Sequence, residues 1–233
     1  MAQPPDTINE TFLREVDENL RRDQLADFGK KYGNWIIAGL ILFLAAAGGW
    51  IWWQQHQVQR SEKQVEDLAQ VYTDIGAGKT ASAPRQLDTL AKSGKKGVRA
   101  SALFARAALA IQQNDLKLAQ STYKEIAGDD SLPKPYRDAA LIRQTALEFD
   151  SIKPEEVIKR LEPLAKPGNP WFSSAGEMTA MALIKQGKRQ DAGRLFAAIA
   201  KDKTVPDESR ARAVQIAGSL GVDAGPLPAA PNP

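Results

Sequence analysis

The feature that most constrains this chain is an uncharged apolar stretch from Trp35 to Trp53. No Asp, Glu, Lys or Arg lies between Lys31 and Arg60, and the centre of the stretch consists mainly of Ile, Leu, Phe and Ala. As a helix the stretch would extend roughly 28 Å, close to the ~30 Å hydrocarbon core of a lipid bilayer. Tryptophans at both ends suit the two interfaces between water and lipid. The stretch therefore predicts a transmembrane helix over residues 34–54.

Two other interpretations of the stretch fit less well. A core helix of a soluble protein rarely runs this far without a polar residue. A cleaved signal peptide has a short basic leader, whereas here 34 residues precede the stretch and seven of the first 33 are acidic. We therefore expect a retained anchor in a lipid bilayer.

Composition argues against several classes of function. There is no cysteine for a disulfide or a thiolate metal site, and His56 alone cannot form a catalytic triad or a multi-histidine metal site. The net charge is only +3 and the basic residues are scattered, so no nucleic acid is expected as a partner. Residues 76–80 resemble the end of a phosphate-binding loop, but position 73 is Thr and a helix is expected before it. We expect no nucleotide, no metal, no cofactor and no enzymatic activity.

The charges that flank the stretch predict its orientation. Thr7 and Glu10 have the spacing of a capping box, and apolar residues at multiples of four follow, which predicts an amphipathic helix in a leader of residues 1–33. That helix would either lie solvated near the lipid or dock a cytosolic partner. Five cations lie in residues 14–31, and two lie in the twenty residues after Trp53. Because cytoplasmic flanks carry the excess of Lys and Arg, we expect a cytoplasmic leader and a C-terminal part in the bacterial periplasm.

A helical pattern continues past the span. Residues expected on one face of this helix recur at spacings of three, four and seven: Val58, Val65, Leu68, Ala69, Tyr72 and Ile75. Gly76 and Gly78 then end the pattern.

The C-terminal part, residues 55–221, is self-similar at a period of 35 to 38 residues. Four quartets share the spacing small, x3, large, x2, aliphatic, Ala: Ala83/Leu87/Leu90/Ala91, Ala119/Tyr123/Ile126/Ala127, Val157/Leu161/Leu164/Ala165 and Ala192/Phe196/Ile199/Ala200. Another helical pattern precedes each of the last three quartets, over residues 100–113, 136–149 and 171–186. Proline follows these three quartets at a nearly constant distance. Helix pairs of this kind cannot bury their apolar faces alone and stack into an α-solenoid.

The period, the small and large residues four apart and the closing proline resemble the tetratricopeptide repeat. The first-helix tryptophan of that motif is absent, so the repeats are degenerate. The sequence predicts an all-α fold, with a single N-terminal transmembrane helix followed by an α-solenoid of about four degenerate tetratricopeptide-like helix pairs. A Pro-rich tail over residues 222–233 is expected to be disordered.

The order of these parts resembles the YfgM family, whose best-known members are ancillary subunits of the bacterial SecYEG translocon. The strongest local likeness is in the leader, with FLREVDE at residues 12–18, RRD at 21–23 and KYG at 31–33. The resemblance covers residues 10–220. It implies a chaperone-like periplasmic role on emerging secretory chains. It also implies two partners, the Sec translocon and a membrane-anchored periplasmic chaperone such as PpiD.

In the tetratricopeptide pattern, the first helices of the pairs line a groove. The candidate groove residues, each of which would also fit a core, are Phe104, Ala108, Ile111, Trp171, Phe172, Glu177 and Met181. We expect a binding module, anchored in the bacterial inner membrane, that holds unfolded secretory proteins or partner proteins in this groove. The alternative is an envelope assembly scaffold with one fixed protein partner and no chaperone activity.

The orientation can be tested with spheroplasts, in which added protease reaches only the periplasmic side of the inner membrane. We expect digestion beyond about residue 60 and an intact leader, because the cation excess lies before the span. In lysed spheroplasts, as the control, the leader should be digested too. Full protection of the C-terminal part in intact spheroplasts would reverse the orientation.

Overall fold

The computed structural model describes the backbone of residues 6–226 and, within it, the side chains of residues 35, 37–56, 58, 59 and 62–226. Every regular element in this range is an α-helix, which confirms the predicted all-α class. The helices in chain order are α1 (Asp6–Gly76), α2 (Ala83–Leu90), α3 (Lys96–Gln112), α4 (Leu116–Gly128), α5 (Lys134–Glu148), α6 (Pro154–Leu161), α7 (Phe172–Lys185), α8 (Arg189–Lys201) and α9 (Asp207–Ser219). The chain divides into two compact units, Met1–Glu62 and Lys63–Pro233.

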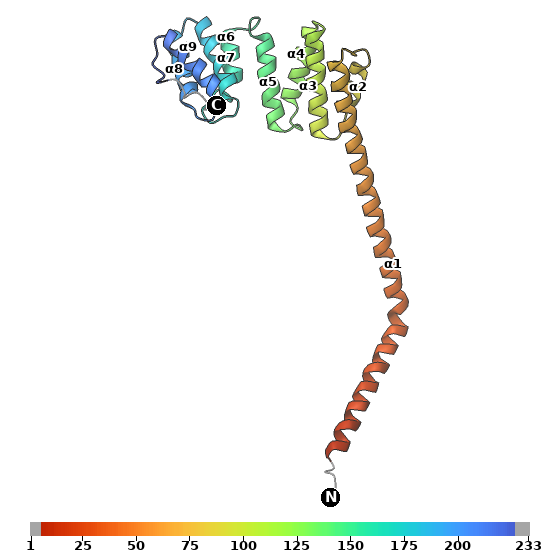
Figure 1. Ribbon diagram of the computed structural model, residues 1–233. Helices are drawn as coiled ribbons and strands as arrows, with labels where there is room; N and C mark the ends of the chain where they lie inside the picture. Colours follow the sequence, from red (N-terminus) through yellow and green to blue (C-terminus); the bar gives the residue numbers. More distant parts are fainter. Residues whose placement is uncertain (1–5, 227–233) are drawn as a thin grey trace. The chain divides into compact units, whose positions relative to one another are not determined.

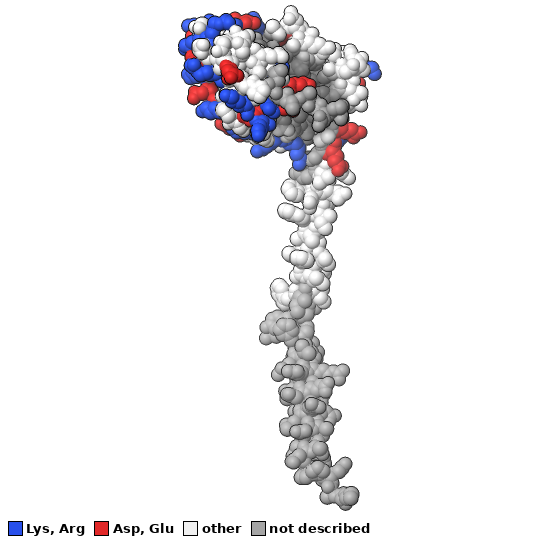
Figure 2. Space-filling view, turned by 60° about the vertical axis from the view of Figure 1, so that its left-hand side comes forward, with Lys and Arg blue, Asp and Glu red and all other residues white. Residues whose placement is uncertain are grey.

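Helix α1 contains the predicted span. The segment Ile37–His56 is long and apolar enough to cross a membrane, and none of it is buried within the protein. In Figure 2 this stretch of α1 is drawn in white, the colour of residues other than Lys, Arg, Asp and Glu. Such a helix is unfavourable in water and stable in lipid, as expected for a membrane-anchored protein. The amphipathic face predicted for the leader lies outside the described side chains.

The last turns of α1 belong to the second unit. Leu68 and Val71 are buried, and Ile75 packs beside them in a cluster with α2 and α3. Val65 and Tyr72, which the sequence pattern placed on this face, are instead 57% and 46% exposed. At about 100° per residue, Val65 and Tyr72 lie roughly 60° and 40° around the helix from Leu68, on the side away from Val71 and Ile75. The prediction of a helix was therefore right. The predicted face was wrong at Val65 and Tyr72, and also at Val58 and Ala69, which are exposed too.

The four quartets form the buried sides of α2, α4, α6 and α8 and of the turns that follow α2 and α6. The first three members of every quartet are at most 5% exposed, and the final alanine packs against the same cluster. The small residue lets a neighbouring helix approach, and the large residues fill the remaining space. The predicted register of the repeats is therefore confirmed.

Each quartet helix is the second helix of a pair. The pairs are the end of α1 with α2, α3 with α4, α5 with α6, and α7 with α8, and Figure 1 shows α2 to α9 following one another in chain order. Four apolar clusters hold the stack, and each draws on three successive helices: α1–α2–α3, α3–α4–α5, α5–α6–α7 and α7–α8–α9. Each of α3, α5 and α7 thus contributes to two clusters.

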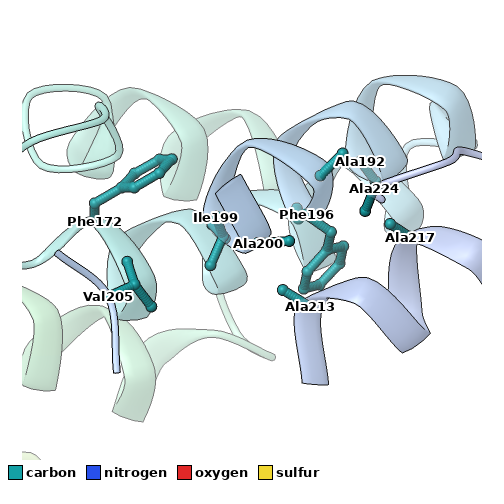
Figure 3. Packing of buried hydrophobic residues seen from close by; sticks show 11 residues of the cluster. Phe172, Ala192, Phe196, Ile199, Ala200, Val205, Ala213, Ala217 and Ala224 are labelled. Atoms are coloured by element: carbon teal, nitrogen blue, oxygen red, sulfur yellow. The ribbon is translucent and has the colours of Figure 1, made fainter. Parts of the chain in front are cut away.

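The C-terminal end of the stack is closed by α9 and the segment after it. The ring of Phe196 on α8 lies beside Ala213 of α9 (Figure 3). Beyond α9, Val222 packs on Gly193, where a Cβ atom would lie 2.6 Å from Cγ2 of Val222. Ala224 is buried in the same cluster. The first residues of the expected tail therefore pack on the domain, and residues 227–233 lie outside the described range.

The repeat register can be tested by truncating one large quartet residue at a time. Tyr123, Leu161 and Phe196 hold equivalent buried positions, so each change to Ala should lower the free energy of unfolding by about 2–5 kcal/mol through lost burial and a new cavity. The exposed neighbours Lys124 and Arg194, changed to Ala as controls, should stay within about 0.5 kcal/mol. Denaturation of the detergent-solubilised chain measures both sets, and equal losses would show that the register is wrong.

Candidate functional site

The candidate site is the open side of the first helices α3, α5 and α7. Two sides of each helix contribute to apolar clusters. On α3 and α5, another side carries charged residues that form ion pairs with neighbouring second helices. Arg106 of α3 pairs with Asp88 of α2, Arg99 of α3 with Asp129 at the end of α4, and Glu148 of α5 with Arg160 of α6. We call the remaining side the first-helix face. Its residues are Phe104, Ala108 and Ile111 on α3, Ala139, Arg143 and Ala146 on α5, and Ser174, Glu177 and Met181 on α7.

The structure places five of the seven predicted groove residues on the first-helix face. Ala108 is exposed, and Ile111 and Met181 are 38% and 45% exposed. Phe104 and Glu177 are half-buried at the same face. Helical spacing explains this grouping, because residues 104, 108 and 111, like residues 177 and 181, stand one or two turns apart on one side.

The other two predicted residues lie where α7 begins. Trp171 is half-buried against the α5–α6–α7 cluster, and its backbone N–H donates to Oδ1 of Asn169 at 2.8 Å. Phe172, the first residue of α7, has no exposed surface and packs in the α7–α8–α9 cluster. Phe172 therefore belongs to the core and offers no contact surface to a partner.

Interactions across the first-helix face and its edges join neighbouring first helices. The Tyr72 hydroxyl donates a hydrogen bond to the Ser101 carbonyl at 3.1 Å, and the guanidinium carbon of Arg143 lies 4.8 Å from the centre of the Phe104 ring. Two ion pairs follow: Lys185 Nζ lies 2.7 Å from Asp150 Oδ1, and Arg212 Nη2 lies 2.7 Å from Glu177 Oε1. In order, these interactions join α1 to α3, α3 to α5, the turn after α5 to α7, and α7 to α9. The two ion pairs are largely open to solvent and each contributes little to stability.

Phe104 is the centre of an aromatic cluster. Its ring centre lies 5.8 Å from that of Tyr123 and 6.5 Å from that of Tyr136, both in tilted arrangements that aromatic rings favour. Burial raises the pKa of the Tyr123 hydroxyl, and the positive charge of Arg143 opposes this only in part. Tyr123 is therefore neutral at physiological pH. Its ring and that of Tyr136 both pack against Phe104.

On the side of α5 that faces α6, a charged network positions the helix that carries Arg143. Arg160 of α6 pairs with Glu148 and donates from Nε to Glu156 at 3.0 Å, while Gln144 donates to Glu148 at 3.1 Å. Burial disfavours the charged form of Glu148, but the hydrogen bonds from Arg160 and Gln144 outweigh it. The pKa of Glu148 therefore lies below its ordinary value.

Among the described residues, no group of three or more His, Asp or Glu side chains is placed to hold a metal ion. A cavity of about 270 Å³ lies between α1 and α2, and Asp67 is the one titratable residue among the described residues that line it. General acid–base catalysis needs groups that converge on one reacting atom, so the open face is the better candidate site.

Comparisons with known proteins agree with the architecture. The family described as "Tetratricopeptide repeat-like domain" matches residues 27–216, which include the span and most of the stack. The chain is also 22% identical over 190 residues to the "Ancillary SecYEG translocon subunit" of Escherichia coli (strain K12), an alignment that covers 82% of this chain and 90% of that protein. No solved structure gives a significant match. The resemblance seen in the sequence is thereby confirmed.

The Glu148 network predicts how stability depends on pH. Because the pKa of Glu148 is lower in the folded than in the unfolded chain, its ionised form stabilises the fold above its ordinary value of 4.5. That contribution is lost as the pH falls below 4.5 and through the folded pKa. We expect Glu148→Gln to lower the thermal midpoint at pH 7 and to converge with the unmodified chain in acid.

The exposed Glu162, 71% accessible and 3.8 Å from Lys166, provides the matched control. Glu162→Gln should change the midpoint little at either pH. A constant gap between the Glu148→Gln variant and the unmodified chain from pH 7 to pH 3 would contradict the assigned role of the Glu148 charge.

Proposed function

We propose, because the chain belongs to the family defined by the tetratricopeptide repeat-like domain, that it holds extended segments of other proteins on its first-helix face. Family membership and the similarity to a translocon subunit mark the chain as a membrane-anchored protein-interaction module. The proposal adds that the leader is cytoplasmic, that the repeats lie in the bacterial periplasm, and that the segments held are secretory chains emerging unfolded from the membrane.

The observation that carries this proposal is the chemistry of the first-helix face. Ala108, Ala139 and Ala146 are small, so a bound backbone can approach the helices closely. Ile111 and Met181 add exposed apolar surface, and the flexible thioether of Met adapts to differently shaped side chains. Such a surface favours apolar segments without requiring one sequence, which is what a chaperone-like protein needs.

The proposed partners follow from the family. The similarity to an ancillary translocon subunit supports the Sec translocon as the source of the bound chains. A membrane-anchored periplasmic chaperone such as PpiD would be a second partner, by the family resemblance. Both partners would meet this protein at the inner membrane, where its span keeps it.

An envelope assembly scaffold is the second candidate. The interactions that join successive first helices favour it, because a face of fixed geometry also suits a single fixed epitope. The two functions differ in selectivity: a chaperone-like face slows aggregation of many unrelated chains, and a scaffold binds one partner.

Aggregation assays with the full chain in lipid nanodiscs separate the two functions. We expect the protein to slow aggregation of several unrelated unfolded proteins without nucleotide, relative to empty nanodiscs. Ala108→Lys combined with Met181→Lys should weaken this effect at least about threefold, because charged side chains resist the desolvation that apolar contact requires.

Lysines at Ser121 on α4 and Gln190 on α8, both exposed and away from the first-helix face, control for the added charge. This control variant should suppress aggregation like the unmodified protein, and circular dichroism should show equal helicity in all three. Capture of one membrane protein without any suppression of aggregation would replace the chaperone-like function with the scaffold.

A further inference from the structure

We propose that Arg143 binds a carboxylate of the held segment, so that the first-helix face prefers an Asp or Glu flanked by apolar side chains. The inference rests on the proposed function and adds a chemical preference to it. The occupant is an extended segment of a protein partner that carries this acidic residue.

Among the residues that the structure describes, Arg143 forms no ion pair, whereas its charged neighbours Lys185 and Glu177 on α7 do. Lys185 pairs with Asp150, and Glu177 pairs with Arg212. Arg143 has no carboxylate oxygen within 4.0 Å among the residues that the structure describes. The first-helix face thus presents a positive charge at α5, which an acidic side chain of a partner would complement.

Arg143 is also held in place before any partner binds. Its guanidinium lies over the Phe104 ring, and that ring also packs against Tyr123 and Tyr136. Stacking on a ring uses the flat side of the guanidinium and leaves N–H groups at its edges free to donate. These donors can form the paired hydrogen bonds that a carboxylate accepts. An ordered side chain also loses less conformational entropy on binding than a free one.

The surroundings of Arg143 define the rest of the bound segment. Ala139 and Ala146, one turn before and one turn after it on α5, leave space for a backbone. Ile111 on α3 and Met181 on α7 offer exposed apolar contacts on the neighbouring helices. The face therefore fits a segment with one acidic residue between apolar ones better than a highly acidic segment.

A purely structural role predicts something different. If Arg143 served only to join α3 to α5, its replacement would lower stability without changing which segments are bound. A preference between matched acidic and neutral segments is therefore the informative readout.

The test measures fluorescence anisotropy of labelled peptides with the full chain in lipid nanodiscs. Two amidated peptides of Ala and Leu differ in one central residue, Glu or Gln, and a third carries Gln with a free C-terminal carboxylate. We expect the Glu peptide to bind at least about fivefold more tightly than the amidated Gln peptide, because of the charge-assisted hydrogen bonds. Equal binding of the third peptide and the Glu peptide would identify the chain terminus as a second carboxylate source.

Variants then locate the preference. Arg143→Gln should abolish it, and Phe104→Leu should reduce it because the guanidinium loses its ring. Arg189→Gln, at an exposed arginine on α8, should leave it unchanged. Arg143→Lys keeps the charge without the planar donors, so it should retain only part of the preference even if Arg143→Gln fails to fold.

The outcomes separate this inference from the proposed function. If none of the peptides binds, the proposed function fails. If the Glu and amidated Gln peptides bind the unmodified chain equally, the proposed function stands and the role of Arg143 is refuted. A preference that persists in folded Arg143→Gln also refutes it.

Discussion

The packing of a small residue against a large one, four positions apart, is the constraint on which this domain depends. A helix pair with this pattern exposes apolar surface on both sides, and each of the four clusters closes only when a third helix joins it. The stack therefore needs distinct ends. The last turns of α1 begin it, while α9 with Val222 and Ala224 completes it.

This packing also decides where a partner can bind. The apolar side chains of α3, α5 and α7 are buried on the sides that contact other helices. The side chains of the first-helix face therefore do not have to pack against the rest of the domain. Small side chains such as Ala108 and Ala146 cost no stability there, and the guanidinium of Arg143 can lie over a ring without an ion-pair partner among the described residues. Function and stability are thus assigned to different sides of the same helices.

Sequence analysis predicted what depends on local spacing and missed what depends on distant neighbours. The quartets were found because their members lie within one or two turns of each other. Trp171 and Phe172 could not be separated, because which of two adjacent aromatics points inward depends on the angle at which α7 starts. Arg143 could not be found either, since its stacking partner Phe104 lies on another helix. The buried Val71 was missed because the predicted face followed Val65 and Tyr72, which lie on the other side of Leu68 around the helix.

The continuity of α1 has a consequence for proteolytic release of the domain from its anchor. Residues 63–76 are both the end of the membrane helix and the first layer of the core. A cut before residue 63 would liberate a domain with all its layers. A cut after residue 76 would remove Leu68 and Val71 from the cluster that buries Leu87 and Leu90 of α2, and the freed product would be prone to aggregate. Only cleavage on the membrane side of that boundary would release a stable domain.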